Sequence, residues 1–215
     1  VLQLHLTDDQ GWRIEIKKHP QLASTEHYTQ DELRDLIAYA ALRNVEIIPE
    51  IDVPGHTVAI LATYPELGCT PSQNMTKEVG KTTNLMLCAS NAKVYEVYKD
   101  ILSEIADLFP SKYIHLGGDE SAIDTNWGQC EHCQTLMKQL NYTKSSQLMI
   151  PFFDQMLNIL EEKKKSPILW CELDNIYPPV KDYLFPYPKS VTLVSWRGQL
   201  TPSCLEFTAQ SGHAL

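Results

Sequence analysis

Five short apolar runs recur along the chain, and longer segments with helical periodicity separate most of them. The runs are Leu2–Thr7, Val45–Ile51, Tyr113–Leu116, Pro167–Trp170 and Val191–Ser195. Short apolar runs that alternate with amphipathic helical patterns are typical of parallel strands joined by helical crossovers. The sequence therefore predicts an α/β fold organised around a parallel sheet.

Three segments predict long amphipathic helices that cover this sheet. The first begins at Thr29, a favourable N-cap residue, and continues to about Asn44. The others extend over Ala92–Leu108 and about Ser146–Lys164. Ordinary core packing explains their apolar faces, so we assign them no ligand role. The stretch Pro65–Cys88 fits neither period and is predicted to be a long excursion after the second strand.

Composition limits the possible partners of the chain. Its 215 residues are 43% hydrophobic, enough to bury a sizeable core, and no linker or internal repeat divides them. The formal net charge is −9. Nucleic acid and anionic membrane surfaces are therefore poor candidates for a main partner, because phosphate binding requires a basic surface. No stretch has the length of a transmembrane helix.

The segment Cys130-Glu131-His132-Cys133 has the CxxC spacing of a zinc knuckle or a redox pair. A zinc site needs a second pair of ligands, and none is found nearby in the sequence. We therefore expect a loop disulfide or two free thiols. The pairing of the six cysteines cannot be predicted from their spacing.

The strand-like run Tyr113–Leu116 ends in Gly117-Gly118 and then Asp119-Glu120. Two residues without side chains leave room for a ligand against the backbone. Two adjacent carboxylates at the end of a buried strand indicate a reactive site, and a hydrolase is the first hypothesis.

The other runs also end in residues that a core would not select. The residues are Asp8, Asp9 and Trp12 after the first run, Glu50, Asp52 and His56 after the second, Trp170 and Glu172 after the fourth, and Trp196 and Arg197 after the fifth. Taken singly, each has an ordinary structural explanation, such as a turn cap or a core aromatic. Because the carboxyl ends of parallel strands open on one face, however, these side chains are predicted to converge on one pocket. Acids, a histidine and tryptophans suit cleavage of a glycosidic bond.

At these positions the sequence resembles the catalytic barrel of the family-twenty glycoside hydrolases, the β-N-acetylhexosaminidases. The matching stretches are Leu4–Arg13, Ile48–His56, Tyr64–Cys69, His115–Glu120 and Val194–Gly198. They follow one another over nearly the whole chain. The resemblance implies a TIM (β/α)8 barrel that is incomplete here, with residues 1–215 supplying about strands two to six and the start of the seventh.

The resemblance also implies a retaining exo-acting mechanism. Glu120 would be the general acid/base, and Asp119 would orient the 2-acetamido group of the substrate. The carbonyl oxygen of that group would be the nucleophile and give an oxazolinium intermediate. Asp8, Asp52 and His56 would support Glu120.

For substrate binding, the resemblance assigns Trp170 and Trp196 to the walls of the sugar site, with Glu172 beside them. It implies no metal and no cofactor. The expected partner is an oligosaccharide or glycoconjugate with a terminal N-acetylhexosamine, and the expected location is secreted, periplasmic or lysosomal.

The chain begins with Val1, already inside a strand-like alternation, so we expect a fragment of a longer protein with little or no activity by itself. Two other hypotheses stay open. One is a catalytically inactive sugar-binding remnant of the same fold. The other is a metal-dependent barrel hydrolase that uses Asp8, Asp52, His56 and Asp119.

Overall fold

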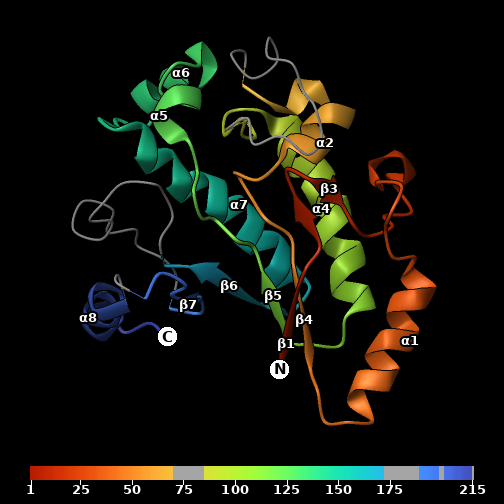
Figure 1. Cartoon of the computed structure of the whole chain (residues 1–215). Helices are drawn as coiled ribbons and strands as arrows, with labels where there is room; N and C mark the ends of the chain where they lie inside the picture. The colour runs from red at the N-terminus through yellow and green to blue at the C-terminus, as the bar shows by residue number, and fades with distance from the viewer. Residues whose placement is uncertain (70–84, 172–188, 199–200, 215) are drawn as a thin grey trace.

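The computed structural model describes residues 1–69, 85–171, 189–198 and 201–214. Within these residues one five-stranded sheet forms the centre of the molecule (Figure 1). Its strands are β1 (Leu2–His5), β4 (Ile47–Glu50), β5 (Tyr113–His115), β6 (Ser166–Trp170) and β7 (Thr192–Val194). All neighbouring pairs are parallel. Each predicted run coincides with one of these strands to within a few residues, so the predicted parallel α/β fold is confirmed.

The order of the strands distinguishes between the two common parallel architectures. In space they follow β1-β4-β5-β6-β7, which is also their order along the chain. A doubly wound sheet reverses direction at a switch point, whereas a barrel adds each strand beside the last. The described part of the chain is therefore an incomplete TIM-type barrel. Beyond β7 the same progression continues, since Leu193 N donates to Ala214 O at 3.0 Å and Thr192 pairs in parallel with Ala214.

The three predicted helices are present. Helix α1 (Gln30–Ala41) begins at the N-cap Thr29, which forms a reciprocal capping box with Glu32, and it ends slightly before the predicted Asn44. Helix α4 (Ala92–Leu108) has the predicted bounds, and α7 (Met149–Glu162) follows the short 3-10 helix η3 (Ser145–Leu148). Helices α4 and α7 lie against each other along the sheet (Figure 1).

The core lies between the sheet and these helices. Helix α4 buries the face that its periodicity predicts, including Val94, Ile101 and Ile105, and the sheet contributes Ile114 and Leu169. A fully buried side chain of this size stabilises the fold by about 1.5–3 kcal/mol. This packing fixes the strands whose carboxyl ends carry the polar clusters.

Several short elements were not predicted. They are the antiparallel hairpin β2 (Thr7–Asp8) and β3 (Gly11–Trp12), the helices α2 (Val58–Thr63), α5 (Ile123–Asn126), α6 (Glu131–Gln139) and α8 (Thr201–Ser211), and the 3-10 helices η1 (Pro20–Leu22) and η2 (Pro65–Leu67). Most are too short for a periodic pattern. The hairpin has a structural role, because it turns the chain after β1 and places Asp8 and Asp9 over the end of the sheet.

Strand β1 forms one edge of the described sheet, and Leu2 in this strand is 46% exposed. Among the described residues, no helix is long and apolar enough to cross a membrane.

Candidate active site

The turn after β5 is shaped by its close approach to Asp52. Gly117 has a φ of +66°, and a Cβ atom built on it would lie 1.8 Å from Asp52 Oδ1. The neighbouring Gly118 N donates to the same oxygen at 3.0 Å. Asp52 is held in place because its own N donates to Thr7 Oγ1 at 2.9 Å. Only a glycine at position 117 combines this φ with this contact.

Asp52 is almost completely buried. Burial, and then the negative charge of Asp119, raise the pKa of Asp52 well above its ordinary value. Asp52 therefore holds a proton more tightly than an ordinary aspartate does.

His56 links three carboxylates at the centre of the site. Its Nδ1 lies 3.2 Å from Asp8 Oδ1, and its Nε2 lies 3.7 Å from Asp119 Oδ2 and 3.8 Å from Glu120 Oε2. The nearby carboxylates of Asp119 and Asp8 raise the pKa of His56 to about 11. The ring is therefore an imidazolium at neutral pH, and it neutralises part of the surrounding negative charge.

Asp8 is the fixed anion behind His56. Burial alone would raise its pKa, but hydrogen bonds from His5 and His56 lower the pKa of Asp8 well below its ordinary value. His5 Nε2 lies 2.9 Å from Asp8 Oδ2, and Asp9 N donates to Asp8 Oδ1 at 2.6 Å. Asp9 in turn accepts from Val58 N at 3.1 Å, so the hairpin and α2 hold each other in place.

The two adjacent acids, Asp119 and Glu120, have different surroundings. The side chain of Asp119 is 15% exposed, and its Oδ1 is buried with no hydrogen-bond partner among the described residues. Glu120 has a φ of +47° and a side chain that is 38% exposed. Arg197 Nη2 donates to Glu120 Oε1 at 2.8 Å. Asp119 can therefore accept a hydrogen bond from a ligand, while Glu120 extends toward solvent.

A buried carboxylate beneath this site, Glu50, had no assigned role in the sequence analysis. It accepts from Gln3 Nε2 at 2.7 Å and from Trp170 Nε1 at 3.0 Å. His5 Nδ1 lies 2.9 Å and His115 Nδ1 3.4 Å from its oxygens. Burial opposes ionisation of Glu50, but the hydrogen bond with His5 and the nearby histidines lower its pKa. The sequence signal for such a buried group was an acid inside a strand-like run, since Glu50 follows Ile47-Ile48-Pro49 and precedes Ile51.

The two predicted aromatic residues lie at the ends of β6 and β7. Trp170 packs on His115 with ring centroids 4.4 Å apart, and burial lowers the pKa of His115 to about 4. Trp196 is 45% exposed, and the Arg197 guanidinium lies 4.5 Å from its ring centroid. The structure thus places Arg197, which was not assigned a role, between Trp196 and Glu120. Glu172 lies outside the described residues.

Two groups of acidic and histidine ligands in this region are compact enough for a cation. One is Asp8, Asp9 and His56, and the other is Asp52, His56 and Asp119. Both include His56, whose two nitrogens face carboxylates. The same distances describe an ion-pair network around the imidazole.

Comparison with known proteins agrees with this fold. Residues 1–215 match glycosyl hydrolase family 20, catalytic domain. The chain is 36% identical to a β-hexosaminidase of Porphyromonas gingivalis over 208 residues, which cover 91% of the chain and 26% of that protein. The X-ray structure of Flavobacterium johnsoniae chitobiase superposes with a TM-score of 0.84 at 34% identity, covering 99% of the chain and 32% of the chitobiase chain.

A third similar structure contains a bound sugar. It is the exo β-N-acetylglucosaminidase of Vibrio harveyi in complex with N-acetylglucosamine, with a TM-score of 0.76 at 30% identity, covering 98% of the chain and 35% of that protein's chain. The chain spans well under half the length of each of these three proteins. From the family match, the strand order and the end of β5, the chain belongs to glycosyl hydrolase family 20.

Proposed function

We propose that residues 1–215 form part of the catalytic barrel of a retaining exo-β-N-acetylhexosaminidase. The substrate would be a glycan that ends in N-acetylglucosamine or N-acetylgalactosamine. Family membership supports this proposal, as does the activity named for the similar Vibrio harveyi protein. The activity is assigned to the full-length protein. The 215 residues alone are expected to lack it, since the five-stranded sheet of the described residues surrounds only part of a barrel site.

The main support for the mechanism is that Asp119 and Glu120 both lie beside the same nitrogen of the His56 imidazole. Asp119 Oδ2 and Glu120 Oε2 lie 3.7 and 3.8 Å from the same Nε2 of His56. A glycosidase that uses a protein nucleophile needs two carboxylates on opposite sides of the scissile bond. Adjacent acids that share one histidine face the same side, so the nucleophile is best supplied by the substrate.

Two bond-making steps follow. In the first, the carbonyl oxygen of the 2-acetamido group attacks the anomeric carbon, the bond to the leaving oxygen breaks, and Glu120 gives that oxygen its proton. The product is a cyclic oxazolinium. In the second, the Glu120 carboxylate takes a proton from water as the water attacks the anomeric carbon and opens the ring. Two inversions give net retention.

Asp119 is proposed to act on the nucleophile. Its buried Oδ1 has no hydrogen-bond partner among the described residues. This oxygen can accept a hydrogen bond from the N–H of the acetamido group. A negative charge beside that N–H stabilises the positive charge that develops on the amide as its oxygen attacks. His56, Asp8 and Asp52 are proposed to position both acids and to balance their charge.

The aromatic residues are proposed to bind the sugar. Trp196 is 45% exposed, and the N–H bond to Glu50 orients Trp170 at the end of β6. Both rings are assigned to stacking on the apolar face of a pyranose. Glu172 is proposed for this region from the resemblance alone. A secreted, periplasmic or lysosomal location is likewise proposed from the family.

The experiment is Glu120→Gln in the full-length protein, with Glu161→Gln, an exposed residue of α7, as the matched control. Loss of a general acid is expected to lower kcat about 10²–10⁴-fold on a disaccharide. The loss should be smaller on an activated aryl glycoside, whose leaving group needs less protonation, and binding of N-acetylglucosamine should persist. Unchanged turnover would refute the assignment. A wild-type protein that binds the sugar without hydrolysing any substrate would support the inactive remnant instead.

A further inference from the structure

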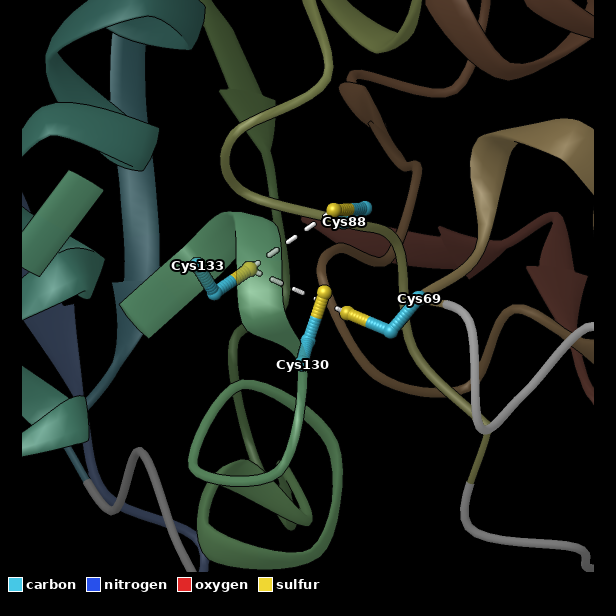
Figure 2. A group of neighbouring side chains, drawn as sticks. All are labelled: Cys69, Cys88, Cys130 and Cys133. Atoms are coloured by element: carbon cyan, nitrogen blue, oxygen red, sulfur yellow. Dashed lines mark hydrogen bonds between the residues drawn. The ribbon is translucent and has the colours of Figure 1, made fainter. Parts of the chain in front are cut away.

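Four of the six cysteines meet in the interior. Cys69 follows η2, Cys88 precedes α4, and Cys130 and Cys133 lie at the start of α6 (Figure 2). All four side chains are buried, and all are free thiols. The CxxC pair therefore has a second pair of cysteines beside it, which the sequence analysis did not find because those residues are distant along the chain.

The spacing of the sulfur atoms fits a tetrahedral metal. Cys133 Sγ lies 3.9 Å from Cys69 Sγ and 3.6 Å from Cys88 Sγ, and all four sulfurs lie within 4.8 Å of one another. Four sulfurs around zinc, each at about 2.3 Å, form a tetrahedron with edges of about 3.8 Å. The observed separations lie on both sides of this value.

Disulfide formation explains this arrangement less well. A disulfide brings two sulfurs to about 2.05 Å and leaves each with one partner. Here Cys133 Sγ lies at similar distances from two other sulfurs, 3.6 Å from Cys88 Sγ and 3.9 Å from Cys69 Sγ (Figure 2). Simple packing of thiols also gives no reason for four cysteines from three separate segments to converge on one point. A shared ion does.

Backbone hydrogen bonds fix the segments that carry two of the four cysteines, Cys69 and Cys88. The segments that carry Cys69 and Cys88 run antiparallel, with a bridge between Gly68 and Leu87 and a bond from Cys88 N to Leu67 O at 2.8 Å. Ser90 Oγ lies 3.2 Å from Cys88 Sγ and 3.6 Å from Cys133 Sγ. A hydroxyl in this position can donate to a metal-bound thiolate and support the ligand geometry.

We propose that Cys69, Cys88, Cys130 and Cys133 bind one Zn²⁺ ion in a closed four-thiolate structural site. Four protein ligands leave no open position for water or substrate, so the ion stabilises the fold and takes no part in hydrolysis. In an oxidising compartment, the ion would also keep the four thiols from forming disulfides.

The site would connect the loops that position the acidic residues. Leu87, beside Cys88, donates its N–H to Pro54 O at 3.0 Å, and its own carbonyl accepts from Trp127 Nε1 at 2.8 Å. Pro54 precedes His56, and Trp127 directly follows α5, the helix between Glu120 and the CxxC pair. Loss of the ion should therefore loosen the segment that carries His56.

The test is the metal content of the full-length protein, purified under reducing conditions with added Zn²⁺ and then dialysed. We expect about one zinc per chain by elemental mass spectrometry, released as a mercurial reagent titrates the thiols. Cys130→Ser should lose the ion and Cys130→His should keep it, because Cys3His sites also bind zinc. Cys204→Ser, a buried cysteine in α8 outside the cluster, is the control and should bind as the wild type does.

A variant that does not fold would leave the wild-type measurement intact. Co²⁺ reconstituted into the wild-type protein should give the thiolate charge-transfer absorption and intense visible bands of a tetrahedral cobalt site. A wild-type protein without stoichiometric zinc, a zinc content unchanged in Cys130→Ser, or disulfides among these four cysteines in the native protein would overturn the proposal. None of these readouts depends on glycoside hydrolysis.

Discussion

Gly117→Ala provides a sensitive test of how the acidic site is built. The added methyl carbon would lie 1.8 Å from Asp52 Oδ1 and 2.3 Å from its carboxyl carbon. Asp52 is buried and accepts from Gly118 N, so the carboxylate cannot move aside without breaking this bond. The substitution should therefore displace Asp52, the turn that carries Asp119, or both.

The cost can be calculated in two parts. An alanine at a φ of +66° costs about 1–2 kcal/mol relative to glycine. A buried amide that loses its acceptor when Asp52 is displaced costs about 1–3 kcal/mol more. The expected destabilisation is about 2–5 kcal/mol, a large share of the 5–15 kcal/mol typical of a folded domain.

The assay is urea unfolding of the full-length protein by circular dichroism, with Gly198→Ala as the control. A Cβ on Gly198 meets nothing within 4 Å, so this variant should unfold as the wild type does. In an Asp52→Ala background the clash with the carboxylate is absent, and only a contact of 3.0 Å with the Cβ of residue 52 remains. Gly117→Ala should therefore cost less there than in the wild-type background, close to the roughly 1–2 kcal/mol of the backbone conformation. A wild-type midpoint for Gly117→Ala, or an equal cost in both backgrounds, would refute the proposed packing.

Two further predictions concern the network around this turn. Trp170→Phe removes the N–H that Trp170 donates to Glu50, so the variant should be less stable by about 1–3 kcal/mol. Because this hydrogen bond orients the ring proposed to stack on the sugar, KM should also rise. An unchanged KM would contradict the assignment of Trp170 to the sugar site. The pKa of His56 is raised to about 11, so the folded state binds this proton more tightly than the unfolded chain, and the resulting stability is fully present below about pH 6.5 and lost as the pH rises through about 11. As the pH rises from about 6.5 to about 11, the urea midpoint should therefore fall less steeply in His56→Gln than in the wild type. An equal pH dependence of the midpoint in the two proteins would contradict the proposed ion pairs of His56.

Local sequence patterns were sufficient to predict much of the architecture. The apolar runs predicted the parallel strands, and the cap at Thr29 and the face that includes Val94 and Ile101 predicted helices, because each signal depends on residues a few positions apart. Because the carboxyl ends of parallel strands open on one face, Asp8 and Asp119 were predicted to approach one another. In the structure both carboxylates lie within 4 Å of the His56 ring.

Other features depend on contacts between residues that are distant in the sequence. The bond between Glu50 and Trp170 spans 120 positions and that between Arg197 and Glu120 spans 77, so no local period reports them. The cysteine cluster was missed for the same reason, because a search beside the CxxC pair does not reach Cys69 or Cys88. The hairpin at Thr7 and Trp12 has strands of two residues, too short for an alternation to show.

The central proposal, a nucleophile supplied by the substrate, is tested most directly by fluorinating the acetamido methyl group. Each fluorine withdraws electrons from the carbonyl oxygen and weakens it as a nucleophile without changing the leaving group. For the full-length protein, kcat on aryl glycosides should fall steadily from the acetyl through the mono-, di- and trifluoroacetyl substrates. A kcat independent of fluorination, with hydrolysis still dependent on Glu120, would contradict the account and require a nucleophile from the protein or the solvent.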